Sequence, residues 1–299
     1  MGISTPKPLV FCHEAMGTTF EIRIAGEESR YANDSAREAF SRLNQLDHCL
    51  NRYATESEIT RIRNLPVGEE LRLSRDTFDC LMLAMELSEY TEGAFDPALG
   101  SFMNLFSGSG STPVCSRVKT GEPGVLELNP ERKTVLHWGD PVDLDLNAMA
   151  RGFALDCMGD VLRDRQIERA FLKAGSESML AMEGPLESDG WNVRFNETHV
   201  LPLRYASIGS STVLNPKNPV IDPQSGELAS GAVRAWAIAP LAAWSDALST
   251  AFVVMEWPKQ LLLCHRFPDV GAVVLEKKEG RFHLHSSKRV TDLGFRPLG

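Results

Sequence analysis

The sequence lacks the paired cysteines of structural zinc sites. Its six cysteines lie far apart along the chain, and no two of them form a C-x-x-C pair. Because structural zinc is normally held by such close pairs, we expect no zinc site. An even number of cysteines permits a disulfide framework. A chain of 299 residues can build a sufficient core without one, however, so buried free thiols are the better expectation.

Long hydrophobic runs and an excess of positive charge are also missing. No stretch approaches the ~20 consecutive apolar residues of a membrane span, and the first residues contain no small-residue cleavage site. We therefore expect a cytoplasmic protein without a membrane span. Lysine and arginine number 31 against 40 aspartate and glutamate, for a formal net charge of -9. A surface of this sign repels phosphate backbones, which argues against nucleic-acid binding, and an anionic small molecule would need a local cation or metal.

Two common functional motifs are absent as well. Residues 107–111 read S-G-S-G-S, but no strand precedes them and no G-x-x-G continuation follows, so they form no dinucleotide fingerprint. The sequence contains no G-x-S-x-G nucleophile elbow, which argues against the usual α/β-hydrolase site.

The periodicity of the apolar residues indicates both strands and helices. Residues 18–24 alternate between apolar and polar side chains, as in a half-buried strand, whereas apolar residues recur at helical spacing in four longer segments. Strands and helices follow one another without a regular βαβ order, which favours an α+β fold. The predicted helices cover residues 35–50, 75–90, 146–165 and 242–255, and further strands are predicted near residues 126–128, 135–136, 170–173, 178–182, 191–195, 233–238, 272–276 and 282–285.

The last predicted helix carries a candidate metal site. Asp246 and Thr250 are four residues apart in S-D-A-L-S-T, so their side chains would lie on one face of the helix. A carboxylate and a hydroxyl placed in this way offer oxygen ligands to a hard cation such as Mg²⁺. From spacing alone, the alternative remains open that Asp246 caps the helix and Thr250 packs sideways.

A second candidate lies in L-D-L-N-A-M-A-R-G-F-A-L-D, residues 144–156. Asp145, Arg151 and Asp156 interrupt an otherwise apolar helix start, and Gly152 permits close approach of another backbone. Arg151 could supply the bidentate cation that a pyrophosphate requires, and a carboxylate near the helix start could accept hydrogen bonds from ribose or adenine. The alternative is a solvated face with one surface ion pair.

Two turns complete the set of candidates. In T-E-G-A-F-D-P, residues 91–97, the proline restrains Asp96 to extended conformations, and the turn can present backbone amides and an aromatic ring to a planar ligand. The small residues around Gly175, in A-G-S-E, permit close backbone approach to a phosphate. Either turn alone is also compatible with an ordinary connection.

Taken together and in order, these segments resemble the FAD:protein FMN transferase (ApbE) family. The resemblance runs from A-M-G-T-T-F-E-I through N-R-Y-A-T-E-S-E-I, the segments just described and V-I-D-P-Q-S-G to S-D-A-L-S-T, and so spans about residues 16–250. It implies a single domain over residues 10–299 with mixed, mainly antiparallel sheets packed with helices. It also implies that Mg²⁺ or Mn²⁺ is held by Asp246, Thr250 and the backbone oxygen of Ala148. The implied FAD contacts are Met16, Tyr53, Ala94, Phe95, Asp96, Asp145, Arg151 and Ile221.

The resemblance further implies a reaction. The family cleaves the FAD pyrophosphate, releases AMP and places FMN on a threonine of a target flavoprotein, so that the acceptor protein supplies the nucleophile. We expect a monomer or a homodimer. Two departures stand out: Pro219 occupies the place of a family histidine, and the segment 206–211 is followed by a short loop without the usual tyrosine. These departures support a catalytically silent flavin-binding protein as one alternative. A Mg²⁺-dependent FAD pyrophosphatase, in which water takes the place of the threonine, is the other.

Smaller departures concern charge and turn shape. Arg151 replaces a family lysine and keeps its charge, and Ser176 replaces the second glycine of a G-G-D turn.

Overall fold

An eight-stranded sheet lies at the centre of the fold. The structure, a computed structural model, describes residues 7–100, 126–139, 142–195, 199–214 and 220–297. Every neighbouring pair in the order β1-β2-β6-β7-β10-β11-β12-β13 is antiparallel. The expected α+β fold with antiparallel sheets is thereby confirmed. The strands are β1 (Leu9–Ala15), β2 (Thr18–Ile24), β6 (Ala170–Ala174), β7 (Ser178–Ala181), β10 (Ala206–Thr212), β11 (Arg234–Ala239), β12 (Gly271–Lys278) and β13 (Arg281–Ser286).

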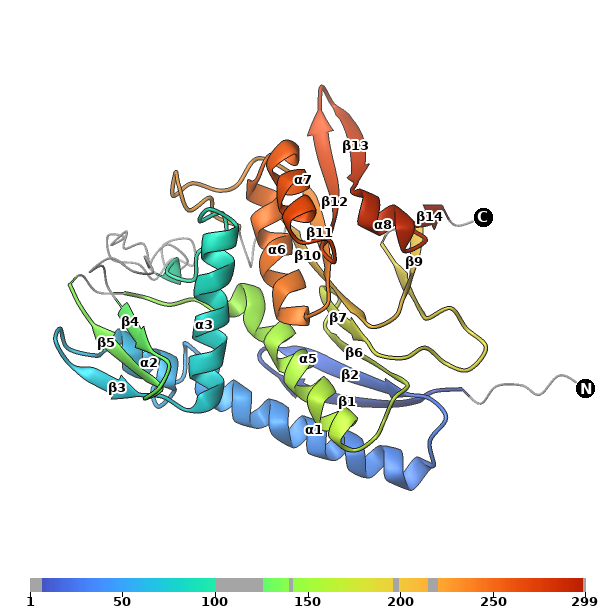
Figure 1. The fold of residues 1–299 in the computed structure, drawn as a ribbon, viewed down its shortest axis with the longest axis horizontal. Coiled ribbons are helices and arrows are strands. Elements are labelled where there is room, and N and C mark those ends of the chain that lie inside the picture. The colour runs from blue at the N-terminus through green and yellow to red at the C-terminus, as the bar shows by residue number, and fades with distance from the viewer. Residues whose placement is uncertain (1–6, 101–125, 140–141, 196–198, 215–219, 298–299) are drawn as a thin grey trace, which may run out of the picture.

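Helices cover one face of this sheet. In Figure 1, α5 and α6 lie between the large sheet and α3, and α1 runs along the lower edge of the molecule. The sequence of α6 is apolar around most of its circumference, as expected for a helix packed on several sides. No helix in the described part of the chain combines the length and apolar character needed to cross a membrane. The helices are α1 (Ser29–Leu50), α2 (Glu58–Arg63), α3 (Arg75–Tyr90), α5 (Asn147–Asp164), α6 (Ala242–Val254), α7 (Trp257–Arg266) and α8 (Lys288–Asp292).

Two three-stranded sheets flank the main sheet. One packs beside α3, on the left of Figure 1, and the other lies toward the C-terminus. Apolar side chains on the second face of the main sheet, including Phe171, Trp236 and Val273, form a separate hydrophobic cluster with Trp191 and Leu203 of this C-terminal sheet. The first sheet contains β3 (Glu70–Arg72), β5 (Thr134–His137) and β4 (Leu126–Asn129), and the second contains β14 (Arg296–Pro297), β9 (His199–Leu203) and β8 (Trp191–Arg194).

Two glycines set how closely α6 approaches its neighbours. A Cβ atom on Gly152 of α5 would lie 2.1 Å from the carbonyl oxygen of Ala242, and one on Gly209 of β10 would lie 2.3 Å from that of Ser245. Both distances are far below van der Waals contact, so only glycine permits this packing. The first turns of α6 are therefore held between α5 and β10 with no side chain intervening at these two points.

Most of the expected elements are present, with three instructive differences. The helix expected from residue 35 begins at Ser29, because its first turns are polar and exposed and carry little periodic signal. The strands β1, β3, β9, β10 and β14 and the helices α2, α7 and α8 are not predicted from the sequence. The expected loop after residue 100 and the S-G-S-G-S tract lie outside the described residues, as does Cys115; the five other cysteines are free thiols.

Candidate active site

A pocket with two adjoining compartments lies where α5, α6, the end of β10 and the 94–99 turn meet. The inner compartment has a volume of about 80 Å³ and the outer one about 540 Å³, and Asn147, Arg151 and Glu177 line both. The inner volume suits a few waters, an ion or a phosphate group, whereas the outer volume is in the range of small-molecule sites, roughly 300–1,000 Å³. A ligand of nucleotide size that reaches the inner compartment would have to extend through both.

Asp246 is fixed in the wall of the inner compartment by two hydrogen bonds to one carboxylate oxygen. The backbone N–H of Gly152 and the hydroxyl of Ser178 both donate to its Oδ2, each at 2.8 Å. The other oxygen, Oδ1, takes no part in these two bonds. The alternative that Asp246 caps its helix is wrong, because α6 begins at Ala242 and Asp246 is its fifth residue.

The charge of Asp246 is poorly solvated. Asp246 is only 5% exposed. This burial raises the pKa of its carboxyl group to about 7, although Arg151 and the hydrogen bond from Ser178 act to lower it. A bound cation would offset this desolvation and favour the ionised form.

The carbonyl of Ala148 is well placed to serve as a further oxygen ligand. In a regular helix its partner would be the N–H of Gly152, four residues later. That N–H also donates to Asp246 Oδ2 at 2.8 Å, so the carbonyl shares or loses its usual donor. Asp246, Thr250 and Ala148 all line the inner compartment. The described residues contain no convergent group of three or more His, Cys, Asp or Glu side chains. A site built from these three different oxygen types nevertheless fits Mg²⁺, which keeps several positions for water or phosphate.

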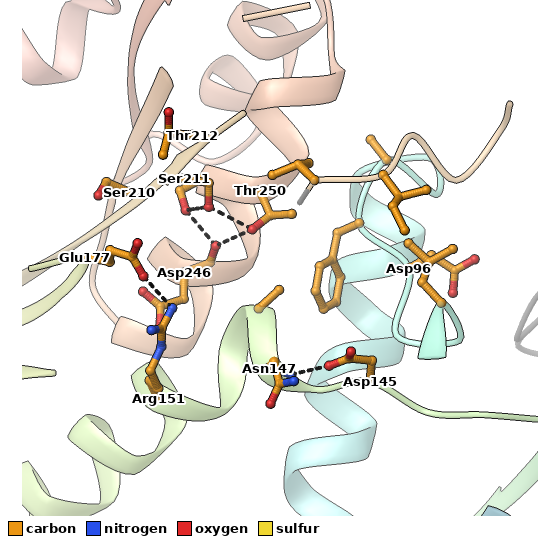
Figure 2. Close-up of a pocket in the computed structure, with 17 residues that line it drawn as sticks. Asp96, Asp145, Asn147, Arg151, Glu177, Ser210, Ser211, Thr212, Asp246 and Thr250 are labelled. Carbon is orange, nitrogen blue, oxygen red and sulfur yellow. Dashed lines mark hydrogen bonds and ion pairs between the residues drawn. The ribbon is translucent and has the colours of Figure 1, made fainter. Parts of the chain in front are cut away.

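Arg151 stands at the boundary between the compartments. Its Nη2 lies 2.8 Å from Oε2 of Glu177, and the two side chains are 24% and 27% exposed. Figure 2 shows this pair directly beside Asp246. The ion pair expected under the simpler interpretation therefore exists, but it lies in the pocket wall. An anion entering the pocket would compete with Glu177 for the guanidinium group.

Asp145 has partners within the protein. Its Oδ2 pairs with the buried Arg52, and its Oδ1 accepts a hydrogen bond from the N–H of Asn147 at 2.9 Å, at the first turn of α5. Its own N–H donates to the carbonyl of Pro97 at 2.7 Å, which ties the 94–99 turn to α5. Asp145 lines the inner compartment, but a ribose or adenine would share its carboxylate with these groups.

The 94–99 turn forms the opposite wall of the inner compartment. Asp96 stabilises it by accepting a hydrogen bond from the N–H of Ala98 at 2.8 Å, and Thr91 accepts one from the N–H of Phe95 at 3.1 Å. Asp96 lies across the pocket from Asp246 in Figure 2. The expected turn is thus present and faces the candidate metal ligands.

The outer compartment is bounded by the β1–β2 hairpin and the segment after α1. Met16 and Gly17 both have positive φ, 48° and 70°, as a two-residue type I′ turn requires. This turn is anchored by the N–H of Met16, which donates to Asp47 at 3.2 Å. Tyr53 lines the same compartment and is 76% exposed, so its ring is available to a ligand.

The structure brings most of the expected site residues together. The inner compartment is lined by Ala94, Phe95, Asp96, Asp145, Ala148, Arg151, Ile221, Asp246 and Thr250, and the outer one by Met16, Tyr53 and again Arg151. Gly175 lines neither of these two compartments; it has φ +58°, and a Cβ there would lie 2.9 Å from the hydroxyl of Thr18. Pro219 lies outside the described residues.

Sequence reasoning missed several residues that line the pocket or hold Asp246 in its wall. Ser178 and Ser211 come from strands, and Ser249 carries no distinctive spacing of its own. Glu177 directly follows the small-residue turn at Gly175, but nothing in the sequence pattern distinguishes its carboxylate from a solvent-exposed one. Only the pairing of β7 with β10 and the packing of β10 on α6 bring these side chains to Asp246 and Thr250.

The fold and pocket define an α+β protein with an oxygen-lined site and one arginine at its entrance. Curated relatives include the FAD:protein FMN transferases of Vibrio cholerae, 26% identical over 62% of this chain and 58% of that protein, and of Haemophilus influenzae, 25% identical over 83% and 81%. The structure resembles the flavin transferase ApbE of Vibrio cholerae with a TM-score of 0.81 at 19% identity, covering 96% of this chain and 99% of that one.

The model of the ApbE family matches residues 16–274. The chain therefore belongs to the ApbE family, as the ordered motifs indicated, and its low identity to these relatives makes it a divergent member.

Proposed function

We propose that this protein transfers FMN from FAD to a threonine of a partner flavoprotein, with release of AMP, in a reaction that depends on Mg²⁺ or Mn²⁺. The single observation that carries the proposal is the environment of Asp246. A buried carboxylate has one oxygen held by two donors and lies in a pocket with Thr250, the Ala148 carbonyl and Arg151. Family membership and the names of the relatives support the flavin substrate.

The chain's own residues would bind and orient the substrate. Asp246, Thr250 and the Ala148 carbonyl would hold the divalent cation, which neutralises charge on the pyrophosphate when bound. Arg151 would exchange Glu177 for a phosphate oxygen. Tyr53 and Met16 would contact the part of FAD that extends into the outer compartment. Because the acceptor threonine supplies the nucleophile, the pocket itself needs no covalent catalyst.

Transfer is tested by incubating the protein with FAD, Mg²⁺ and a flavoprotein carrying the acceptor threonine. We expect the intact mass of the acceptor to increase by one FMN less one water, because a phosphoester bond forms to the threonine. The Asp246→Ala variant should lose this activity at least 100-fold, on the order of the loss when a metal-dependent charge contact is removed. A matched control is Asp160→Ala, which removes an exposed carboxylate from α5 that pairs with Arg163. An unmodified acceptor would reject the transferase.

The same reaction without acceptor separates the alternatives. Release of AMP and FMN at the full rate would identify a pyrophosphatase, with water in place of the threonine. Flavin binding with neither product would identify a silent flavin-binding protein. The replacement of a histidine by Pro219, which cannot transfer a proton, together with the shortened loop, is the sequence feature behind the silent flavin-binding alternative.

A further inference from the structure

Three hydroxyl groups meet where the end of β10 packs on α6. The Oγ of Ser211 lies 2.9 Å from the Oγ of Ser249 and 2.9 Å from the Oγ1 of Thr250, and Ser249 donates to the backbone oxygen of Asp246 at 2.8 Å. All three residues line the inner compartment, and Figure 2 shows Ser211 and Thr250 above Asp246. The Oγ1 of Thr250 also lies 3.5 Å from the backbone oxygen of Asp246, which is a long and weak contact.

Counting protons fixes the direction of these hydrogen bonds. A carbonyl oxygen only accepts, so the bond from Ser249 to Asp246 uses the one proton of the Ser249 hydroxyl. Ser249 must then accept from Ser211, and Ser211, with its proton used, must accept from Thr250. Only the order Thr250 to Ser211 to Ser249 to the Asp246 carbonyl satisfies all three short contacts together.

This order has a consequence for Thr250. Its proton points toward β10, so its lone pairs are left for the inner compartment, as a neutral hydroxyl ligand of a hard cation requires. We propose that Ser211 is a positioning residue that orients the Thr250 hydroxyl for metal binding. The proposal rests on the proposed function, because it takes Thr250 to be a metal ligand.

The strand holds Ser211 firmly in this role. Gly209, two residues earlier on the same face of β10, allows the strand to approach α6 to backbone contact at Ser245. Ser211 is also paired in register with Ala235 of β11. The hydroxyl of Ser211 is thus presented from a strand within the sheet, rather than from a loop, to a helix that cannot move away without opening that contact.

The test compares Ser211→Ala with Ser207→Ala. Ser207 lies on the same strand and face, four residues earlier, and its hydroxyl donates to the carbonyl of Ala239 at 2.8 Å, away from the pocket. Ser207→Ala loses one buried hydroxyl hydrogen bond and Ser211→Ala loses two that are partly buried, so we expect the two variants to lose comparable thermal stability. We expect only Ser211→Ala to weaken Mn²⁺ binding, by about fivefold, as for the loss of one ordinary hydrogen bond. Electron paramagnetic resonance in the absence of flavin measures this affinity.

Kinetics and rescue give two further readouts. In the transfer assay, Ser211→Ala should raise the Mg²⁺ concentration for half-maximal activity by a similar factor and leave kcat at saturating Mg²⁺ within about twofold. Ser211→Thr, which keeps the hydroxyl, should restore the Mn²⁺ affinity. In a Thr250→Ala background, the Ser211→Ala change should have no further effect on Mn²⁺ affinity, because its target is gone.

Several outcomes would overturn the proposal. Mn²⁺ affinity that is equal in Ser211→Ala and wild type, an equal loss in Ser207→Ala, or additive losses with Thr250→Ala would each reject a positioning role. A wild-type protein that binds Mn²⁺ but does not transfer FMN would reject the transferase, while the Mn²⁺ comparison would still decide the role of Ser211. A wild-type protein that binds no Mn²⁺ at all would reject both.

Discussion

The most demanding single position in the fold is Gly152. Its missing side chain lets α5 contact the first turn of α6, and its N–H is one of the two donors that hold Asp246. The same residue therefore serves the packing of two helices and the geometry of the candidate metal ligand. At an exposed position within a helix, glycine destabilises the helix by about 1 kcal/mol relative to alanine. Here the close contact reverses that preference.

We expect Gly152→Ala to lower the free energy of unfolding by about 2 kcal/mol or more, because the new methyl group would meet backbone atoms that cannot rotate away. Gly159→Ala is a matched control in the same helix. Its Cβ would lie 3.0 Å from the end of the Leu180 side chain, which can shift. Together with the gain in helix propensity, this variant should remain within about 1 kcal/mol of wild type. Urea denaturation measures both values, and equal stabilities of the two variants would contradict the argument.

At the scale of whole elements, the start of α6 depends on a side chain from another helix. The Oδ1 and Oδ2 atoms of Asp156 in α5 accept hydrogen bonds from the N–H groups of Ala242 and Ala243, at 2.8 and 2.9 Å. The residue that precedes α6, Leu241, provides no side-chain cap of its own. Asp156 thus satisfies two of the free N–H groups at this helix end and ties α6 to α5.

Replacing Asp156 with alanine should therefore destabilise the protein by about 1–2 kcal/mol, as for loss of a helix cap. Asparagine keeps one acceptor oxygen and should have a smaller effect. Thermal or urea unfolding at pH 6 would measure both. The Asp160→Ala variant is the control, because Asp160 is an exposed carboxylate on the same helix without such a bond. If Asp156→Ala were as stable as Asp160→Ala, the proposed cap would be wrong.

The same aspartate predicts a pH dependence. Burial raises the pKa of Asp156 to about 7, against the opposing effect of its two backbone hydrogen bonds, from an ordinary value of 3.8. The folded state then binds this proton more tightly than the unfolded state, so the contribution to stability is complete below about pH 4 and is lost as the pH rises through about 7. The unfolding free energy of wild type, relative to that of Asp156→Asn, should decrease from pH 5 to pH 8. A difference that is constant or increases over this range would contradict the assignment.

The helices α3 and α5 could be predicted from sequence because each has one buried side with a periodic apolar stripe. α6 could be predicted from its mostly apolar sequence, and the bounds of all three helices lie within two residues of those observed. β10 could not be recognised, because A-S-I-G-S-S-T shows no alternation between apolar and polar residues. It is covered by α6 on one face and by the second hydrophobic cluster on the other, so small residues serve both faces.

Only part of the candidate site could be predicted from the sequence. Asp246 and Thr250 share one helix, so their spacing alone placed them together. The residues that orient them could not be found in this way. Ser178 is 68 positions from Asp246 and Ser211 is 39 from Thr250, and only the strand order of the sheet brings them into contact. Sequence periodicity carries no information about such long-range pairings.

For the molecule as a whole, the negative net charge and the position of the pocket predict that binding of the proposed metal and of the flavin would be interdependent. The formal charge of -9 opposes an anionic pyrophosphate, and Arg151 is already paired with Glu177. A cation at Asp246 would supply attraction that the protein surface does not. FAD should therefore bind more tightly when Mg²⁺ is present, and by linkage Mg²⁺ more tightly when FAD is present.

This interdependence should be visible in the melting temperature. A ligand at 100 times its dissociation constant stabilises the folded state by about 2.7 kcal/mol, which corresponds to a shift of roughly 4 °C for a chain of this size. We expect FAD and Mg²⁺ together to raise the melting temperature by more than the sum of their separate effects. In Thr250→Ala the excess should disappear, while the shift from FAD alone should remain, because the outer compartment is unchanged. Strictly additive shifts in wild type would mean that the cation and the flavin do not meet in this pocket.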